Sequence, residues 1–549
     1  MPRRLLIAYL LCVGARGLVF GPRAAAAPTR LAASASAVGT AFDDVDDAAL
    51  ARAGSTPPAM SGALPAWLRG AYVRNGPGSW TAGDGQALKH VFDGYALVTR
   101  FEFDGSAGTM SFRGAARVDS AAWRAAKGGA MRFNEFGTSA GQTPAERARV
   151  LLKGVVEGGI TDNAGINLVR TNDGRTIAYT EPVDGTYEVD AKTLRTGKQV
   201  SFSGARTGQV QTAHPLRTPV SNRLVNVGTE LAPFAAYTVY DHDPDNFERR
   251  RAIARIEPAA AVSPMTKRET KSLLGQVSWQ HSFGLCERFA VLLEQPAVYD
   301  IGALVGASQA AHVAFDWQPR RRTWAHVVDL DTGAVVTRCC EPSFFFFHIA
   351  NTFEDGDDVC VDLCTYNDAK MVNGLLLDRM RAPPTNATPK SHLKRLRIPG
   401  AARSDAQKRK APPATLEQLD DAAATGDYSE FPTINAAHAA GNAAYRFVYS
   451  VGMRRPTNAA NTLVKTDVSA KQSVVAQLAR SYGVVGEPVF VARPGGTAED
   501  DGVILVVCHA ADGSTDIVVV DAATMVECAR AQLETPIPYG FHGIFLFDA

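Results

Sequence analysis

The stretch Pro342-Ser-Phe-Phe-Phe-Phe-His-Ile-Ala-Asn-Thr-Phe-Glu354 places four consecutive phenylalanines directly before a single histidine. A run this apolar indicates a buried segment, so the imidazole of His348 loses its hydrogen bonds to water. It must then bond a carbonyl or carboxylate, as a core histidine does, or coordinate a metal ion. Three more histidines, His214, His281 and His542, also stand beside small or aromatic residues and away from runs of charge. These four residues are the first candidates for a functional site.

The composition is that of an ordinary globular protein. The chain has 549 residues, 46% of them hydrophobic and 21% charged, and its 57 basic side chains balance 56 acidic ones. This balance provides no electrostatic argument for nucleic acid, so we expect no nucleic-acid partner. The 8 cysteines are scattered and include no CxxC pair, so neither a disulfide framework nor a cysteine-based metal knuckle is indicated.

Residues 1–37 have the composition of a targeting leader. Two arginines precede the apolar run Leu5 to Val13, which is within signal-peptide length and too short to span a membrane. Residues 14–37 are rich in Ala, Ser and Arg and free of acidic residues, as transit peptides are. A signal peptide followed by a transit peptide resembles the leaders that import proteins into complex algal plastids, so we expect a plastid protein; secretion is the alternative. Residues 38–63 are interpreted as a linker.

Beyond Ala71 the chain consists of short strand-like segments between turn signals, for example Gly94–Asp104, Ile166–Arg170 and Phe289–Glu294. Alternating apolar and polar residues with Gly and Asp punctuation predict an all-β protein. A strand followed by Asp-x-x-Thr and a returning strand recurs after Tyr187, His326 and Ile517. Recurrence of one hairpin type along a long all-β chain favours a repeated architecture, of which propellers are the largest class.

Two segments depart from this pattern. Thr143-Pro-Ala-Glu supplies a helix N-cap, a proline at the first helical position and a carboxylate three residues on, so we expect a helix there in a cap over the β body. Residues 382–426 are rich in Ala, Pro, Lys and Arg with little strand pattern, and we interpret them as a long insert of surface loops.

Common catalytic signatures are absent from the sequence, which contains no GxSxG, HExxH, P-loop or GxGxxG motif. The four candidate histidines are instead separated by 67, 67 and 194 residues. Side chains this far apart can meet only where their segments converge. The axis of a propeller is such a place, because the innermost strand of every blade faces it.

A set of short motifs accompanies the histidines: Arg74-Asn-Gly-Pro, His90-Val-Phe-Asp-Gly, Asn134-Glu-Phe-Gly-Thr, Thr161-Asp-Asn-Ala, Gln280-His-Ser-Phe-Gly, His348-Ile-Ala-Asn-Thr-Phe-Glu, Glu430-Phe-Pro-Thr-Ile-Asn, Gly486-Glu-Pro-Val-Phe and Phe541-His-Gly. In these motifs the chain resembles the carotenoid cleavage dioxygenase family, which includes the animal carotene oxygenases and the retinal pigment epithelium isomerase. The resemblance extends from Leu64 to the C-terminus. It implies one domain over residues 64–549, built as a seven-bladed β-propeller with a helical or loop cap.

The resemblance also implies a metal site. One non-haem Fe(II) is expected on the axis, held by His214, His281, His348 and His542. Imidazole suits Fe(II), and four neutral ligands on an octahedral ion leave two positions for dioxygen or water. The family supports its metal-bound rings with three glutamates, because a carboxylate that accepts the second N–H fixes a ring and offsets the metal charge. By motif these are Glu181 for His281, Glu430 for His348 and Glu487 for His542, which leaves His214 without a carboxylate partner.

The implied activity is Fe(II)-dependent cleavage of a C=C bond in a carotenoid or apocarotenoid by O2, giving two aldehyde or ketone products. Alternatives are a polyene or retinoid isomerase or isomerohydrolase on the same iron site, a stilbene-cleaving dioxygenase, and a ligand-binding propeller without enzymatic activity. We expect Trp279, Phe283, Phe347 and Phe541 to form apolar tunnel walls, with plain core as the alternative. A peripheral membrane contact is expected at Ile301, Leu304 and Val305, since the polyene substrate dissolves in lipid. The segment Ser120–Lys127 departs from the Pro-Asp-Pro-Cys-Lys of animal members, so animal substrate choice is not transferred.

Overall fold

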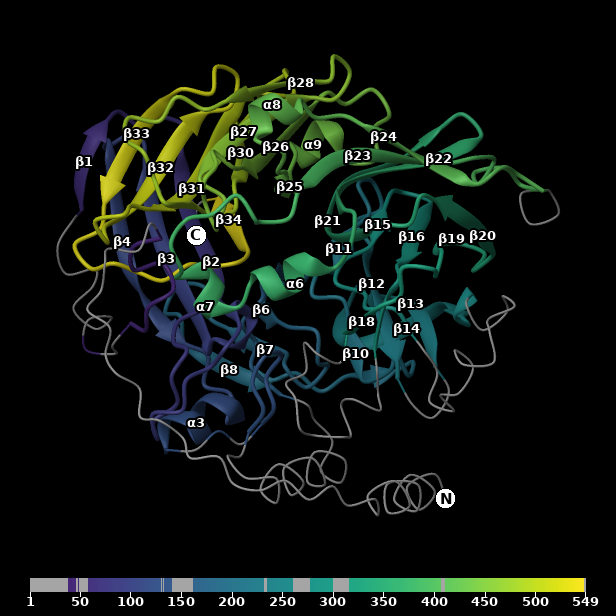
Figure 1. The fold of residues 1–549 in the computed structure, drawn as a ribbon, viewed down its shortest axis with the longest axis horizontal. Helices are drawn as coiled ribbons and strands as arrows, with labels where there is room; N and C mark the ends of the chain where they lie inside the picture. The colour runs from purple at the N-terminus through teal and green to yellow at the C-terminus, as the bar shows by residue number, and fades with distance from the viewer. Residues whose placement is uncertain are drawn as a thin grey trace.

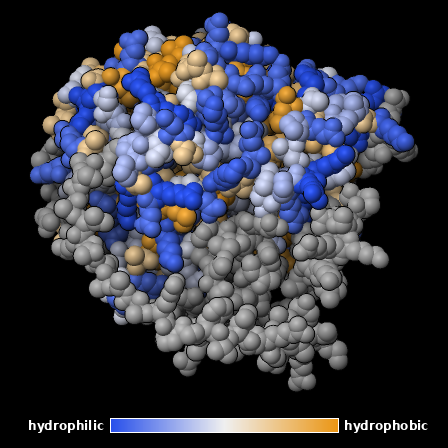
Figure 2. All heavy atoms as spheres, viewed as in Figure 1, coloured by the Kyte–Doolittle hydropathy of each residue, from blue (hydrophilic) through white to orange (hydrophobic). Residues whose placement is uncertain are grey.

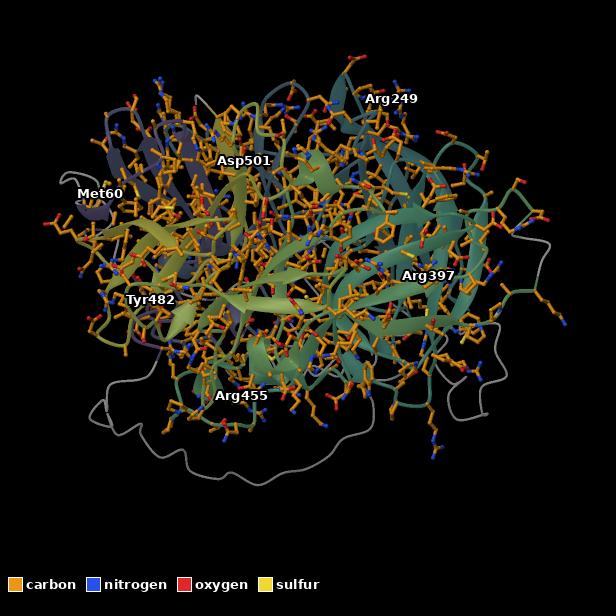
Figure 3. All side chains as sticks on the ribbon, turned by 90° about the horizontal axis from the view of Figure 1, so that it is seen from above. Met60, Arg249, Arg397, Arg455, Tyr482 and Asp501 are labelled. Atoms are coloured by element: carbon orange, nitrogen blue, oxygen red, sulfur yellow. The ribbon has the colours of Figure 1, made fainter. Side chains whose placement is uncertain are left out.

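Strands dominate the computed structural model, and the predicted all-β class is confirmed. The structure describes residues 38–45, 48, 58–129, 131, 133–140, 161–231, 235–259, 277–299, 315–405 and 410–547. The sheets surround a central region in a propeller-like arrangement (Figure 1). Figure 3, the view from above, places Met60 and Arg397 on opposite sides of the middle of the molecule, with side chains filling the space between.

In the described residues the strands form seven sheets. The first contains β34 (Gly543–Phe547), β2 (Arg69–Pro77), β3 (Ala96–Asp104) and β4 (Thr109–Arg117), and the second β5 (Asn167–Arg170), β6 (Thr176–Tyr179), β7 (Tyr187–Val189) and β8 (Thr196–Gln199). The third contains β10 (Val210–Gln211), β11 (Leu216–Arg217), β12 (Leu224–Glu230), β13 (Ala236–Asp243), β14 (Asn246–Ile256) and β9 (Ser203–Gly204).

The largest sheet has eight strands, in the order β15 (Gly284–Leu285), β16 (Phe289–Glu294), β19 (Thr323–Asp329), β20 (Val335–Glu341), β24 (Ala414–Gln418), β23 (Ser391–Ile398), β22 (Asp358–Tyr366) and β21 (Phe345–Asp355). A two-stranded sheet joins β17 (Ala297–Tyr299) to β18 (Phe315–Trp317). The remaining two contain β25 (Glu430–Thr433), β26 (Phe447–Gly452), β27 (Thr462–Asp467) and β28 (Gln472–Val475), and then β29 (Val484–Val485), β30 (Val489–Ala492), β31 (Gly502–His509), β32 (Thr515–Asp521), β33 (Glu527–Gln532) and β1 (Ala59–Gly62).

The phenylalanine run explains how strand β21 is buried. Phe345 and Phe347 pack into one hydrophobic cluster with β26 and β31, whereas Phe344 and Phe346 pack into another with β16 and β22. Successive side chains of a strand point to opposite faces, so a strand covered on both faces needs apolar residues at every position. The consecutive phenylalanines therefore place β21 between two apolar cores.

Other core clusters lie between neighbouring sheets in the same way. Leu505 of β31 and Val519 of β32 share a cluster with Phe101 of β3, and Val227 of β12 shares one with Leu292 of β16. Every residue of β31 is buried. Inter-sheet packing of this kind stacks the sheets side by side and directs their inner edges to a common centre.

The ends of the described chain close the ring. Strand β34 pairs antiparallel with β2, and β1 pairs antiparallel with β33, so the first and last sheets each contain strands from both ends. Figure 1 shows the purple N-terminal strands beside the yellow C-terminal ones. The guanidinium of Arg74 on β2 also donates to the carbonyl of Pro538, at 2.9 Å, which ties the same two segments.

The recurrent hairpin predicted from the sequence is present in all three places. β7 pairs with β8, β19 with β20 and β32 with β33, each antiparallel. In each turn the aspartate carboxylate accepts backbone N–H groups that follow it: Asp190 from Lys192 and Thr193, Asp329 from Asp331 and Thr332, and Asp521 from Thr524. These bonds satisfy turn amides that have no partner in the ladder, which explains the Asp-x-x-Thr signature.

Among the described residues helices are few and short: α3 (Ala121–Lys127), α6 (Lys370–Gly374), α7 (Leu377–Met380), α8 (Ala422–Thr425), α9 (Ala436–Ala439) and the 3-10 turn η1 (Val91–Asp93). Helices α6 and α7 lie across the middle of the face seen in Figure 1. The described helices include none long and apolar enough to cross a membrane. The helix predicted at Thr143 lies outside the described residues.

The interpretation of residues 382–426 as surface loops is wrong. The segment contains β23, β24 and α8, and β23 pairs with β22 along its whole length. Basic residues obscured its strand pattern. Leu393, Leu396 and Ile398 are buried, whereas Arg395 and Arg397 pair with Asp362 and Asp358 on β22, at 2.8 and 2.9 Å.

The interpretation of residues 38–63 as a linker is also wrong for the described part. Phe42 is 2% exposed, and its ring lies 6.1 Å from that of Trp80 and 5.5 Å from that of Tyr539. Tyr539 N–H donates to the carbonyl of Ala41 at 2.6 Å. This segment is therefore part of the folded core.

Phe42→Ala is expected to destabilise the protein by about 3 to 5 kcal/mol, because it leaves a cavity between two aromatic rings. Deletion of residues 1–37 is expected to leave the melting temperature unchanged, since their composition contains no strand pattern. Thermal melts of both variants, with Val220→Ala as a control at a side chain that is 83% exposed, test this. An unchanged melt for Phe42→Ala would contradict the assignment of this segment to the core.

Candidate metal centre

The four candidate histidines come from three sheets, two of them from the opposite edges of the eight-stranded sheet, and meet at one point. His214 lies between β10 and β11, His281 precedes β15, His348 lies within β21, and His542 precedes β34. Each of these strands is at the edge of its sheet. One ligating atom from each histidine lies within 4.8 Å of those of the other three. The structure thus brings together residues that the sequence separates by up to 328 positions, from His214 to His542.

A bulge directs His348 towards the centre. The pairing of β21 with β22 is regular up to Phe346 and shifts register between Phe346 and Ile349. Such a bulge turns a side chain out of the alternation of its strand. Because Phe346 and Phe347 are both buried in the inter-sheet cores, the shift lets the next residue face the other histidines.

Three of the histidines are held by glutamates in the pairing expected from the sequence. The Nδ1 atom of His281 lies 2.8 Å from Glu181, that of His348 lies 2.6 Å from Glu430, and that of His542 lies 2.7 Å from Glu487. Among the described residues His214 has no carboxylate partner. The carboxylates accept the Nδ1–H protons, so the Nε2 atoms of these three rings carry lone pairs.

The facing Nε2 atoms fit a cation. The Nε2 of His281 lies 3.2 Å from that of His214 and 3.4 Å from that of His348. Since the Nδ1 atoms of His281 and His348 carry the protons, their Nε2 atoms cannot donate to each other, and two lone pairs at this distance repel. A metal ion between them turns this repulsion into coordination. Neutral imidazoles with carboxylates behind them are a donor set that suits divalent iron and related metals.

The pKa shifts within the cluster also favour a bound cation. Burial, and then the charges of the neighbouring rings, hold the pKa of His214 and His348 well below the usual 6.5, so both remain neutral and free to act as ligands. Burial raises the pKa of Glu430 to about 8. A buried carboxylate without a counter-charge is costly, and a cation beside its histidine partner supplies that charge.

Phe431 is held in a strained position over the centre. Its φ of 49° is in the left-handed region, which is unusual for an aromatic residue. In this conformation its backbone N–H donates to the Glu430 carboxylate at 3.0 Å, and its ring lies 4.9 Å from that of His348. One backbone conformation thus both fixes the carboxylate and covers the histidine.

An apolar pocket of about 740 Å³, including its open mouth, leads to the histidines. Its wall includes His281, His348 and His542 at the centre. The rest is mostly apolar or aromatic and includes Val91, Phe92, Phe347, Tyr366, Met371, Leu375, Met380, Tyr428, Phe431, Met453, Val485 and Phe541. Among the coloured atoms on the face seen in Figure 2, hydrophilic residues predominate and hydrophobic ones form small groups.

The expected tunnel residues divide between the pocket and the core. Phe347 and Phe541 line the pocket. Phe283 does not: it is 0% exposed and packs with Leu292 and Val328 in a cluster between two sheets. Trp279 contacts the centre from behind, where its indole N–H donates to Glu181 at 2.8 Å. The expected membrane residues Ile301, Leu304 and Val305 lie outside the described residues.

Sequence reasoning missed part of the wall. Met371 and Leu375, with α7 and its Met380, lie against the pocket, and Val372 accepts a bond from His90 Nε2 at 2.8 Å. The apolar residues of this segment recur at helical spacing, which is the signal that could have indicated it. The same bond gives His90 a structural role, because it ties the segment of Val372 to η1. Phe92 of η1 faces the ring of His281.

Comparisons with known proteins agree with this geometry. The family model described as retinal pigment epithelial membrane protein matches residues 50–546. The chain is 33% identical over 503 residues to carotenoid cleavage dioxygenase 8 homolog A, chloroplastic, of Oryza sativa subsp. japonica, which covers 89% of this chain and 84% of that protein. It is 29% identical over 525 residues to the mitochondrial carotenoid-cleaving dioxygenase of Homo sapiens, covering 88% and 87%.

Solved structures show the same fold. Cobalt-substituted Synechocystis ACO superimposes with a TM-score of 0.72 at 23% identity, over 89% of this chain and 95% of that one. A variant of Synechocystis apocarotenoid oxygenase gives 0.71 at 23% identity over the same shares. The resemblance inferred from the motifs is thereby confirmed. The chain belongs to the family of the retinal pigment epithelial membrane protein and the carotenoid cleavage dioxygenases, and it is an enzyme of that family.

Proposed function

We propose that this enzyme is an Fe(II)-dependent dioxygenase that cleaves one C=C bond of a carotenoid or apocarotenoid. The observation that carries the proposal is the convergence of four imidazoles, three of them held by carboxylates, at the inner end of an apolar pocket. In the reaction the C=C and O–O bonds break and each carbon gains one oxygen atom, so that one polyene and one O2 give two carbonyl products. No further reductant is needed.

The iron would be held by His214, His281, His348 and His542. When bound, it supplies the site at which O2 is activated for addition to the double bond. Glu181, Glu430 and Glu487 keep three imidazoles in the Nδ1–H form, with their lone pairs directed inward, and they balance the metal charge.

The pocket wall determines what reaches this centre. Phe92, Phe347 and Phe541 form part of an aromatic surface beside His281 and His542, with Phe92 lying 5.5 Å from Phe541 and 6.3 Å from Phe347. Such a surface excludes water and packs against a flat conjugated chain without competing for hydrogen bonds. These contacts would hold one double bond beside the histidines.

We also infer that the architecture is a single seven-bladed propeller. The eight-stranded sheet divides into two four-stranded halves, one beginning with the segment of His281 and the other with the strand of His348. The halves meet through β20 and β24, which pair in parallel over two positions, Cys340 with Ala414 and Glu341 with Thr415. Counting these halves separately, and β17–β18 as an appendage, gives seven blades. Because β1 pairs with β33, the domain begins before Leu64.

Replacement of His348 by Ala is expected to abolish iron retention and product formation, and the same holds for His214, His281 and His542. Glu181→Gln, Glu430→Gln and Glu487→Gln should weaken iron affinity or activity by roughly 10 to 100-fold, because each ring exchanges a charged carboxylate acceptor for a neutral amide oxygen but keeps its lone pair. Metal analysis after anaerobic reconstitution, with product assays, measures both effects. His438→Ala serves as a control outside the cluster, and full activity in His348→Ala would refute the site.

Incubation of the iron-loaded protein with a panel of carotenoids, apocarotenoids and stilbenes under ¹⁸O2 should give two products, each carrying one ¹⁸O when isolated before exchange with water. Mass spectrometry measures both the cleavage position and the label. A product with the mass of its substrate would indicate an isomerase instead. Cleavage of a polyene ester, incubated in parallel, without incorporation of label would indicate an isomerohydrolase.

We propose further that the enzyme acts at a plastid membrane. Its leader has transit-peptide composition, the rice relative is chloroplastic by name, and a polyene reaches an apolar pocket more readily from a bilayer than through water.

A fluorescent fusion of the full chain in an alga with a complex plastid should enter the plastid and sediment with its membranes. Leu304→Glu with Val305→Glu should enter equally but remain in the soluble fraction. Membrane binding that survives this change would rule out the proposed contact, and secretion of the fusion would rule out the location.

A further inference from the structure

Trp279 lies two residues before His281 in an extended segment. Its backbone N–H donates to Ala297 at 2.9 Å, and its carbonyl accepts from the side chain of Gln295 at 3.1 Å. In extended backbone, side chains two residues apart point to the same side. Trp279 and His281 therefore face the same neighbour, the loop that follows β6 and carries Glu181.

Trp279 and His281 each form a hydrogen bond to the carboxylate of Glu181. The indole Nε1–H of Trp279 donates to Glu181 Oε2 at 2.8 Å, and His281 Nδ1 lies 2.8 Å from Glu181 Oε1. Each oxygen thus has its own donor, in the geometry of a charge-assisted bond. With both oxygens bonded, the carboxylate cannot rotate away from the imidazole.

The other two carboxylates of the cluster are steadied by the backbone. Glu487 accepts Gly543 N–H at 3.0 Å in addition to His542, and Glu430 accepts Phe431 N–H at 3.0 Å in addition to His348. Glu181 stands in a loop, and its second donor in the structure is a side chain. Packing fixes that donor: Trp279 is 1% exposed, and its ring lies 5.6 Å from Phe136 and 5.7 Å from Phe347.

We propose that Trp279 is a positioning residue of the metal centre, which acts through Glu181 on the orientation and basicity of His281, and that its indole N–H supplies this effect. The proposal replaces the role of tunnel wall expected from the sequence. It rests on the proposed function, because the ligand of the histidine cluster is taken to be Fe(II). The polar end of the indole serves the carboxylate while its apolar body fills the core.

The test is the dissociation constant for Fe(II), measured by anaerobic equilibrium dialysis of the full chain. Trp279→Phe keeps an aromatic ring but removes the N–H, and we expect Kd to rise about 10-fold. Trp80→Phe is the matched control: its indole is also 1% exposed and donates at 3.1 Å, but to the carbonyl of Val91. We expect this control to bind Fe(II) as the unaltered chain does.

A double-mutant cycle separates positioning from general packing. In the Glu181→Ala background, Trp279→Phe should cause no further loss of Fe(II) affinity, because the residue through which it acts is gone. An equal loss in both backgrounds would overturn the proposal. Substitution of Trp279 by 3-benzothienylalanine, which has sulfur in place of the indole N–H, keeps the shape of the ring and should reproduce the loss even if Trp279→Phe folds poorly.

The outcomes distinguish a failure of the proposed function from a failure of the role proposed for Trp279. If the unaltered chain binds no Fe(II), the proposed function fails. If it binds Fe(II) and both Trp279 variants bind it equally well, the proposed function stands and the role of Trp279 is refuted.

Discussion

The hydrogen bonds between β34 and β2 are the interaction on which the metal centre depends. They close the ring of sheets, and they also place the last histidine. Phe541 N–H donates to Asn75 at 2.9 Å, and Asn75 N–H donates to His542 at 2.8 Å, so two backbone bonds bracket His542 on the neighbouring strand. Residues 74 and 543 then begin the regular pairing. Because the same bonds close the fold and position a ligand, an open ring would have three histidines at its centre and no fourth.

Burying a polar cluster at the centre of an apolar core costs desolvation free energy. This cost explains how the cluster is organised. Four imidazoles and three carboxylates lie at the end of a pocket whose wall is largely hydrocarbon. Without a cation, burial drives the groups towards their neutral forms, as the raised pKa of Glu430 and the lowered pKa of His214 and His348 show. A divalent ion reverses this preference, since it stabilises the carboxylates and uses the neutral lone pairs. The site is therefore suited to a bound metal, and metal binding should contribute to the stability of the folded state.

The two sides of the centre serve different purposes. Behind the histidines, Glu181, Glu430 and Glu487 and their second donors form a rigid polar support. In front of them, Phe92, Phe347 and Phe541 form an apolar surface that could bind a substrate without polar groups. Trp279 belongs to the first side through its N–H and to the second through its packing against Phe347. This division explains why a residue expected in a tunnel wall is found at the carboxylate instead.

The sequence by itself determined the strand class, the Asp-x-x-Thr hairpins and, with the help of motif resemblance, the four histidines and their three glutamates. These features are local: a strand alternates, a turn needs its aspartate, and a motif keeps its residues in order. Only the tertiary structure decided which distant groups touch. It showed that Phe42 is core, that Arg395 and Arg397 of β23 pair with aspartates on β22, that Phe283 packs away from the pocket, and that Trp279 bonds Glu181, which is 98 residues away. Contacts of this kind arise when the sheets stack and the ring closes, and neither event leaves a periodic signal in the chain.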